Sequence, residues 1–131
     1  LADKDVIYVQ GGNTFYLLKI LKESGADTVI TKLVKRGILY IGVSAGSYIA
    51  CPTIEMATWK PRDRNMYGLK DLTALALVPF LLTVHYKDRY ADVIQREVER
   101  SAYQVRILTD EQALLVLDDQ VSLVGTGAEI K

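Results

Sequence analysis

The sequence predicts an α/β fold in which a mostly parallel sheet is flanked by helices. Three observations carry this prediction. Short apolar segments alternate with segments of helical periodicity, glycine-rich turns follow two of the apolar segments, and the C-terminal part ends in a pattern typical of an antiparallel edge hairpin. With 131 residues, 50% of them hydrophobic, the chain can form one core, and we treat residues 1–131 as a single domain.

The first predicted unit is a strand, a glycine loop and a helix. Val6–Val9 is continuously apolar and rich in β-formers, which is typical of a strand buried on both faces of a parallel sheet. The polar segment 10–13 ends this strand. Thr14 can cap a helix whose apolar residues recur at helical spacing, and Gly25 follows its last turn.

The second predicted unit repeats this order. A helix is expected from Ala26 to Arg36, with Gly37 as its stop signal. A second buried strand follows at residues 38–43 and leads directly into a serine-glycine turn. A short helix over residues 48–51 ends before a proline.

The second half of the chain begins with a polar segment at residues 53–70, which we interpret as a loop or lid. The elements predicted after it are a short strand at 81–84, an amphipathic helix at 88–103, a strand at 105–108, and a hairpin of 113–117 and 121–124.

Composition excludes several classes of protein. The chain has 16 basic and 16 acidic residues, and no basic cluster is accompanied by an aromatic ladder, so we expect no nucleic acid as a partner. A small neutral or zwitterionic substrate fits this balance better. The longest mostly apolar run, residues 72–84, is too short to span a bilayer, so we expect no membrane partner. The oligomeric state stays open, with a homodimer among the options.

The sequence has a single cysteine and no signal peptide. Cys51 is the only cysteine, which excludes an internal disulfide and any zinc site built from several cysteines, and it agrees with a cytoplasmic location. The chain opens on Leu1 and passes within five residues into a strand, without a signal peptide. We therefore expect that an N-terminal portion of the fold is missing.

Ser44 is the first candidate catalytic residue. It stands in Gly42-Val43-Ser44-Ala45-Gly46, between a buried strand and a helix, with glycines where side chains would collide in a tight turn. This is the pattern of a nucleophile elbow, and the helix N-terminus would favour the oxyanion formed when the hydroxyl attacks a carbonyl. A plain strand-to-helix turn or a phosphate-binding turn would have the same spacing.

Two further features belong to the same predicted edge of the sheet. Gly11-Gly12-Asn13 follows the first strand, and its amides could donate to an oxyanion or simply form a tight turn. His85 is the only histidine and follows a predicted strand, so any imidazole base for Ser44 must be His85, although a core histidine is the commoner role.

A third group must orient the imidazole. Spacing alone leaves several carboxylates open, and Glu111 has the advantage that it follows a predicted strand and could reach the same crevice. The candidates are Glu55, Asp63, Asp71, Asp110 and Glu111.

Three blocks of sequence occur in a characteristic order. They are YVQGGNTF at residues 8–15, KRGILYIGVSAGS at 35–47, and VPF at 78–80 leading to VHY at 84–86. Together they resemble the peptidase S51 family, which contains aspartyl dipeptidase (peptidase E) and cyanophycinase. The resemblance implies a fold similar to class I glutamine amidotransferases, a serine-histidine-glutamate triad, and an N-terminal portion of several strands and helices before the Gly-Gly-Asn loop.

Carried over by motif, the resemblance implies that Ser44 is the nucleophile, His85 the base and Glu111 the acid, with Asp63 as the runner-up. It also implies an oxyanion hole formed by the N–H groups of Gly12 and Ala45. Arg89 is the nearest match to the arginine that binds the substrate's aspartyl carboxylate in aspartyl dipeptidases. No metal and no organic cofactor are implied.

We therefore expect a cytoplasmic serine peptidase that cleaves dipeptides or other short peptides through an acyl-enzyme. An α/β-hydrolase esterase shares the elbow, but in that fold the acid precedes the histidine, which favours an acid among residues 55–71. A non-catalytic binding domain on an amidotransferase-like scaffold is the alternative from another class.

Overall fold

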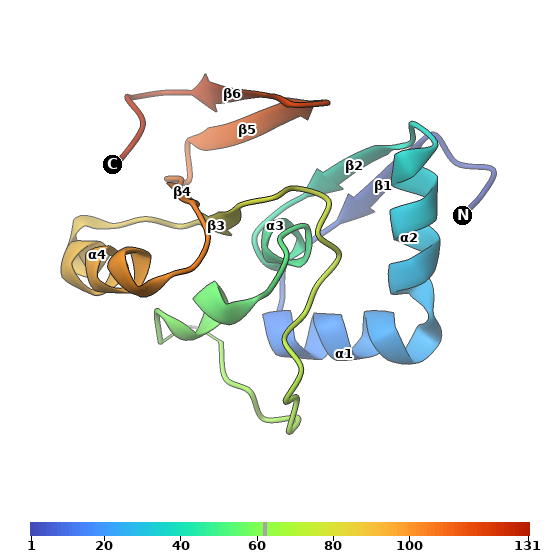
Figure 1. Ribbon diagram of the computed structural model, residues 1–131, viewed down its shortest axis with the longest axis horizontal. Coiled ribbons are helices and arrows are strands. Elements are labelled where there is room, and N and C mark those ends of the chain that lie inside the picture. The colour runs from blue at the N-terminus through green and yellow to red at the C-terminus, as the bar shows by residue number, and fades with distance from the viewer. Residues whose placement is uncertain (62) are drawn as a thin grey trace.

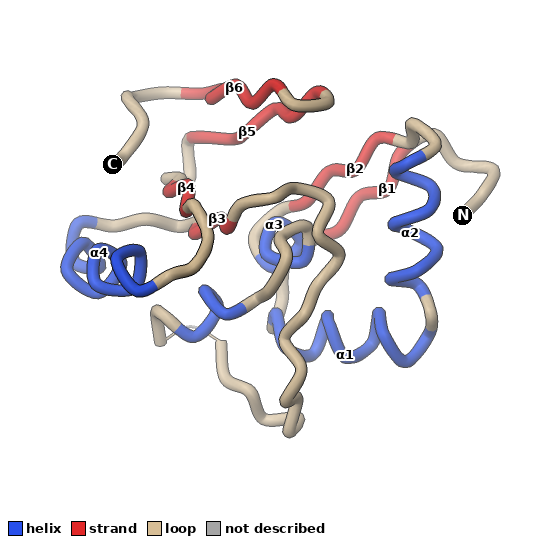
Figure 2. Tube along the Cα trace, in the orientation of Figure 1, coloured by secondary structure: helices blue, strands red, loops and turns tan. Residues whose placement is uncertain are grey.

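The computed structural model describes residues 1–61 and 63–131, and it has α/β architecture (Figures 1 and 2). In chain order its elements are β1 (Val6–Val9), α1 (Thr14–Ser24), α2 (Ala26–Lys35), β2 (Leu39–Gly42), α3 (Ala45–Ile49), the 3₁₀-helix η1 (Glu55–Thr58), β3 (Leu81–Thr83), the 3₁₀-helix η2 (Asp88–Tyr90), α4 (Ala91–Arg100), β4 (Val105–Ile107), β5 (Gln112–Leu117) and β6 (Gln120–Gly125).

β1 and β2 form a parallel pair joined through α1 and α2. Val6 is paired with Leu39 and Val9 with Gly42, so both strands end at the same edge. Ile7 is buried in the core, whereas Tyr8 is 56% exposed. The prediction that these strands are buried on both faces is therefore wrong: the core covers one face, and no described element covers the other.

The helix ends follow from local chemistry. Asn13, not Thr14 as predicted, is the N-cap of α1, and its side-chain oxygen accepts the N–H of Tyr16 at 3.0 Å. At the other end, Gly25 adopts the left-handed conformation with φ 74°, as the sequence predicts. This sharp turn between α1 and α2 lets both helices pack on the core that includes Ile7, Leu18 and Leu33.

The segment after α3 is only partly the polar loop that the sequence predicts. Ile54 and Met56 are fully buried, and Trp59 is 9% exposed, so η1 and its flanks belong to the core. The long connection from residue 63 to β3 has neither helix nor extended strand (Figure 2). It contributes one isolated bridge, in which Thr73 pairs with Thr53.

The strands form three two-stranded sheets instead of one continuous sheet (Figure 1). β3 pairs with β4 in parallel, and β5 pairs with β6 in the predicted antiparallel hairpin. Parallel pairing is thus present, but β2 and β3 are not hydrogen-bonded to each other. The packing of α3 against both parallel pairs connects them instead.

The helices are short. α4 covers Ala91–Arg100 rather than the predicted residues 88–103, because η2 precedes it and Ser101 leaves the helical conformation. Its buried residue is Ile94.

Among the described residues, no helix has the length and apolar character needed to cross a membrane.

Candidate active site

Ser44 lies at a sharp turn between β2 and α3, with φ 57° and ψ −114°. Residues other than glycine rarely adopt such dihedral angles, and strained backbone of this kind is concentrated at functional sites. The turn lifts the Ser44 side chain beyond the end of β2. This is the elbow geometry that the sequence predicts at this position.

The glycines on each side of Ser44 are required by close contacts. A Cβ atom on Gly46 would lie 2.0 Å from the carbonyl oxygen of Val9, and one on Gly42 would lie 2.5 Å from the carbonyl oxygen of Gly46. The Tyr40 hydroxyl donates to this Gly46 oxygen at 2.6 Å, and the Ser47 hydroxyl donates to the Gly42 oxygen at 2.9 Å. The start of α3 is therefore fixed directly against the end of β1.

The Gly11-Gly12 loop lies beside Ser44. A Cβ atom on Gly11 would lie 3.2 Å from Cβ of Ser44, and Gly12 has φ 125°, a conformation that favours glycine. The Val43 N–H donates to the Val9 carbonyl oxygen at 2.9 Å, so the hydrogen bonding between the two strands continues as far as the turn. The two loops thus meet at the carboxyl ends of adjacent parallel strands, which is where ligands bind in sheets of this type.

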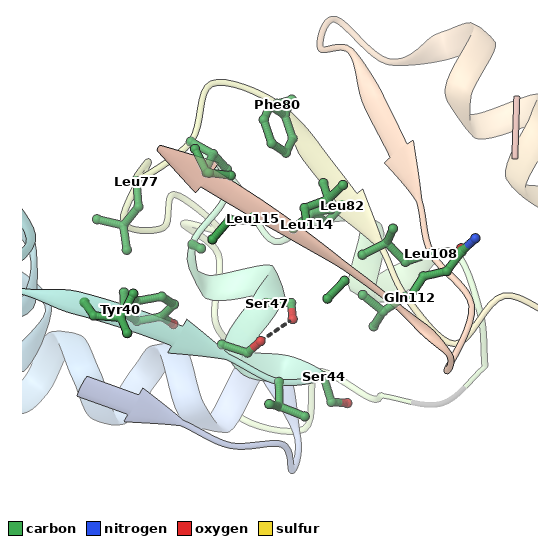
Figure 3. A pocket seen from close by; sticks show the side chains of 18 of the residues that line it. Tyr40, Ser44, Ser47, Leu77, Phe80, Leu82, Leu108, Gln112, Leu114 and Leu115 are labelled. Carbon is green, nitrogen blue, oxygen red and sulfur yellow. Dashed lines mark hydrogen bonds between the residues drawn. The ribbon is translucent and has the colours of Figure 1, made fainter. Parts of the chain in front are cut away.

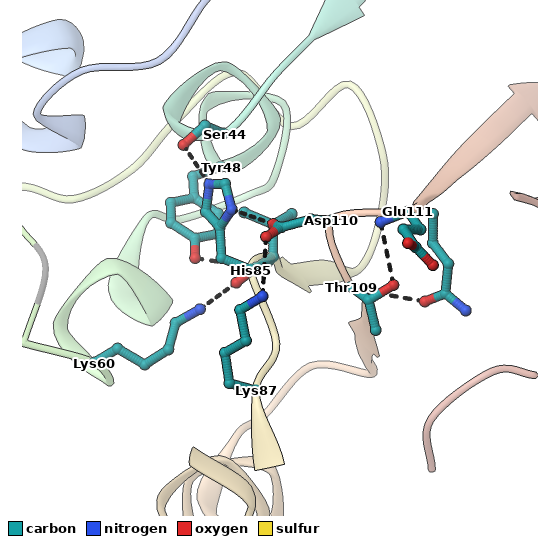
Figure 4. A network of polar contacts seen from close by, with 10 residues as sticks. Ser44, Tyr48, Lys60, His85, Lys87, Thr109, Asp110 and Glu111 are labelled. Carbon is teal, nitrogen blue, oxygen red and sulfur yellow. Dashed lines mark hydrogen bonds and ion pairs between the residues drawn. The ribbon is translucent and has the colours of Figure 1, made fainter. Parts of the chain in front are cut away.

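His85 reaches Ser44 from the end of β3. Its Nε2 lies 2.9 Å from Oγ of Ser44 (Figure 4). The backbone of His85 also has a positive φ, 58°. The side chain is 28% exposed, so the imidazole is half-buried between α3 and solvent. The structure brings together the two residues that the sequence identifies as nucleophile and base.

The carboxylate next to His85 belongs to Asp110. Oδ1 of Asp110 lies 2.5 Å from Nδ1 of His85, and Oδ2 lies 3.2 Å from Nζ of Lys87. The hydrogen bond with His85 lowers the pKa of Asp110 below its ordinary value, and Lys87 adds to this effect. Asp110 is therefore held as a carboxylate beside the imidazole.

The structure places Asp110, and not the predicted Glu111, next to the His85 imidazole. Glu111 is exposed; its backbone N–H donates to Thr109 Oγ1 at 3.3 Å, and its carbonyl accepts the N–H of Thr126 at 3.2 Å. A tight turn begins at Thr109, after the end of β4. It presents Asp110, the residue before Glu111, to His85 (Figure 4). A gapped motif match cannot resolve a shift of one residue in such a turn.

The other candidate carboxylates have different positions. Asp63, the runner-up, accepts the N–H of Thr14 at 3.1 Å and the Thr14 hydroxyl, so it binds the first turn of α1. Asp71 pairs with Lys22 at 3.5 Å, and Glu55 lies in η1. None of these contacts involves His85.

A cavity of about 670 Å³ opens beside Ser44 and His85. Figure 3 shows leucine side chains of β5 and of the segment before β3 facing β2 across this space. Ser47 and Asp110 also line it, while most of the lining is aliphatic or aromatic. The arrangement offers a hydroxyl nucleophile at the mouth of an apolar pocket.

Arg89 is not among the residues that line this cavity. Its guanidinium donates to the Tyr90 hydroxyl at 3.2 Å and lies 4.9 Å from the centre of the Tyr90 ring. Arg89 is exposed in η2, so the structure does not bring it to Ser44. Within the described residues, no group of three or more His, Cys, Asp or Glu side chains could hold a metal ion.

Three residues near the site were not singled out by their sequence. Lys60 donates to the carbonyl of Val84, Tyr48 accepts the Val84 N–H at 3.4 Å, and Lys87 pairs with Asp110. The apolar residues that precede Lys60 could have indicated that this lysine follows a core segment. Its partner, 24 residues away, has no sequence signal.

Comparison with known proteins places this chain in a family. A model of Peptidase family S51 matches residues 1–124. An uncharacterized peptidase of Listeria innocua, Lin0382, is 36% identical over 124 residues, which cover 92% of this chain and 59% of that protein. A peptidase E of Citrobacter koseri is 43% identical over 125 residues, covering 95% and 49%.

The same relationship appears in three dimensions. A crystal structure of a protein assigned as peptidase E from Listeria monocytogenes EGD-e superposes with a TM-score of 0.81 at 32% identity, over 95% of this chain and 61% of that chain. The chain therefore spans about half to three fifths of the length of these relatives. On the family model that matches almost its whole length, this chain belongs to peptidase family S51.

Proposed function

We propose that this chain carries the catalytic site of a serine peptidase that hydrolyses dipeptides or other short peptides through an acyl-enzyme on Ser44. The observation that supports this proposal most strongly is the chain of contacts from Ser44 Oγ to His85 Nε2 at 2.9 Å and from His85 Nδ1 to Asp110 at 2.5 Å. Nucleophile, base and orienting acid are the three parts of a serine-hydrolase triad.

The ionised Asp110 can only accept a hydrogen bond, so it selects the His85 tautomer with its proton on Nδ1. Nε2 is then free to accept the Ser44 proton as Oγ attacks the scissile carbonyl. The imidazolium formed in this step is stabilised by Asp110 and returns the proton to the leaving amine. Water then attacks the acyl-enzyme, His85 acts as base again, and the carboxylic acid leaves.

The oxyanion of each tetrahedral intermediate needs donors that are already in place. We assign this role to the N–H groups of Gly12 and Ala45. Ala45 is the first residue of α3, where an N–H has no acceptor within its own helix, and Gly12 lies on the loop that contacts Ser44. Two preorganised amides beside the nucleophile would stabilise the developing charge.

The apolar cavity supports a substrate with a neutral, apolar side chain next to the scissile bond. Leu82, Leu108 and Leu114 line this space, and a charged aspartyl group would lose its hydration there without gaining a cation. The resemblance to aspartyl dipeptidases suggests Arg89 as the binder of such a group, but Arg89 contacts Tyr90 instead. We therefore expect Leu-X dipeptides to be hydrolysed faster than Asp-X dipeptides.

The position of the acid also bears on the competing functions. An α/β-hydrolase esterase has its acid before the histidine, whereas Asp110 follows His85, which supports the S51 mechanism.

We extend the proposal to the amidotransferase-like architecture and the cytoplasmic location that the resemblance implies. The buried, unpaired thiol of Cys51 is compatible with a reducing compartment.

A fluorophosphonate probe tests the proposal directly. We expect intact-mass spectrometry to show one covalent adduct on the folded chain, at Ser44, and none on Ser44→Ala or His85→Ala. Ser101→Ala, at the end of α4, is the matched control and should label like the unmodified chain. A folded chain that hydrolyses no dipeptide and forms no adduct would support the non-catalytic binding domain and reject the peptidase.

A further inference from the structure

Lys60 is a charged residue in the core of this protein. Its relative exposure is 3%, although lysine is almost never fully buried unless its ammonium group has partners. Nζ donates a hydrogen bond to the carbonyl oxygen of Val84 and lies 5.5 Å from the centre of the Tyr90 ring. The side chain therefore crosses from the segment after η1 to the segment after β3, which carries His85.

The acceptor of this hydrogen bond is the peptide group that joins Val84 to His85. Val84 lies just beyond β3 and is 8% exposed, so its polar groups cannot be satisfied by bulk water. Its carbonyl accepts from Lys60, and its N–H donates to the Tyr48 hydroxyl at 3.4 Å (Figure 4). Both polar groups of Val84 are thus held by side chains.

His85 needs this support because its own backbone is in the left-handed region, with φ 58°. A non-glycine residue keeps such a conformation only where its surroundings determine it. On the other side of His85, Tyr86 donates its N–H to Leu108 at 3.0 Å. The strained residue is therefore fixed on one side by a strand-like bond and on the other by Lys60 and Tyr48.

We propose that Lys60 is a positioning residue that holds the Val84–His85 peptide and thereby aims the His85 imidazole at Ser44. The inference rests on the proposed function, because it gives Lys60 a role in the Ser44–His85 reaction. Tyr48 has a complementary role. It lies on α3, one turn after Ser44, so its hydroxyl connects the helix of the nucleophile to the peptide of the base.

Loss of the Lys60 hydrogen bond would leave the Val84 carbonyl buried without this donor. The peptide could then rotate to relieve the positive φ of His85, and the imidazole would move away from the 2.9 Å contact with Ser44. Misplacement of a catalytic group by about 1 Å can lower the rate of a reaction ~100-fold. Lys60 itself does not line the apolar cavity, so the substitution removes no direct contact with a substrate bound there.

Lys60→Met is the central variant, since methionine keeps the length and apolar contacts of the stem and removes the donor. We expect kcat to fall on the order of 10- to 100-fold with KM nearly unchanged. Lys60→Arg, which retains a donor, should recover part of this loss. Lys35→Met, at the exposed end of α2, is the matched control and should keep the kcat of the unmodified chain.

A second readout does not depend on turnover. His85 is the only histidine in the sequence, so its ring resonances can be assigned in an NMR spectrum without further labelling. The Nδ1 proton that His85 shares with Asp110 should give a downfield signal in the unmodified chain and a weakened or missing one in Lys60→Met. This measurement keeps its meaning even if the chain hydrolyses none of the peptides tested, so the proposed function can fail separately.

The inference is overturned if folded Lys60→Met keeps both the kcat and the His85 signal of the unmodified chain. It is also overturned if Lys35→Met loses as much activity as Lys60→Met. Should Lys60→Met fail to fold, Tyr48→Phe decides, because it removes the hydroxyl that accepts the Val84 N–H on the other side of the same peptide segment. A several-fold lower kcat with an altered His85 signal supports the positioning role, and unchanged values for both reject it.

Discussion

Oδ1 of Asp110 lies 2.5 Å from Nδ1 of His85, while Glu111, the next residue along the chain, is exposed. This relationship decides which carboxylate supports the imidazole. We expect Asp110→Asn to lower kcat about 1000-fold, because an amide can donate to Nδ1 and thereby favour the wrong tautomer.

Glu111→Gln is the matched variant for Asp110→Asn and should keep kcat within about threefold of the unmodified chain, since loss of an exposed charge changes little. Steady-state hydrolysis of a dipeptide measures both. A larger loss in Glu111→Gln than in Asp110→Asn would contradict the assignment of the acid.

The pH dependence of activity follows from the lowered pKa of Asp110. Because this pKa lies below the ordinary carboxyl value, Asp110 stays ionised until the pH falls below the range in which carboxyl groups ordinarily titrate. We therefore expect the acid side of the kcat/KM profile to show one ionisation. A limb with a slope of two, measured between pH 4 and 8, would show that the Asp110 carboxyl also titrates in this range and would contradict its lowered pKa.

The same shift affects stability in a defined direction. A carboxyl group whose pKa is lowered by folding stabilises the native state above its unfolded pKa, and this contribution is lost as the pH falls through the folded value. The Asp110 side chain is 48% exposed, so the effect should be small. Urea denaturation of Asp110→Asn should consequently differ less from the unmodified chain at acidic pH than at neutral pH.

Gly46 should tolerate no side chain. A Cβ atom there would lie 2.0 Å from the Val9 carbonyl oxygen, and the contact is between two backbone segments that cannot move aside. We expect Gly46→Ala to lower the free energy of unfolding by about 3 kcal/mol or to prevent folding. Gly68→Ala is the control, because Gly68 has φ 63° but open space around it, and should cost only about 1 kcal/mol.

Two fully buried threonines should respond oppositely to the same substitution. Thr83 Oγ1 has no hydrogen-bond partner among the described residues, whereas the Thr14 hydroxyl donates to Asp63. Replacement of Thr83 by valine removes an unsatisfied group, so we expect a gain of about 1 kcal/mol in the free energy of unfolding. Thr14→Val should lose about 2 kcal/mol. Chemical denaturation that finds the same sign for both would contradict this explanation.

Cys51 should be inert in the folded chain. The thiol is fully buried, and burial raises its pKa to about 12, so very little thiolate exists at neutral pH. Iodoacetamide at pH 8 should leave Cys51 unmodified over hours and alkylate it rapidly in urea. Mass spectrometry distinguishes the two states, and rapid alkylation without denaturant would show that the core around α3 opens.

The elbow could be predicted from sequence because its requirement is local and steric. Gly42 and Gly46 must lack side chains because backbone atoms near Ser44 and at the end of β1 lie too close. The Gly-x-Ser-x-Gly spacing follows from these contacts and is visible in the sequence. His85 could be identified because the chain offers no other imidazole. The helix boundaries at Gly25 and Gly37 follow from equally local signals.

What could not be predicted depends on partners far along the chain. The choice between Asp110 and Glu111 is made by a turn that Thr109 stabilises, and a shift of one residue there exchanges the two carboxylates. The burial of Lys60 depends on a carbonyl 24 residues away. Likewise, the apolar pattern of β1 could not reveal that only one of its faces is covered in this structure.

Both residues of the central hydrogen bond, Ser44 and His85, have positive φ angles. Each such residue lowers the stability of the native state by about 1 kcal/mol relative to glycine, so the site destabilises the native fold. Ser44→Gly should therefore unfold at a higher urea concentration than the unmodified chain while it loses all chemistry. For anyone engineering a more stable version of this chain, resistance to unfolding and the proposed catalysis compete at these two positions, so added stability must come from elsewhere in the chain.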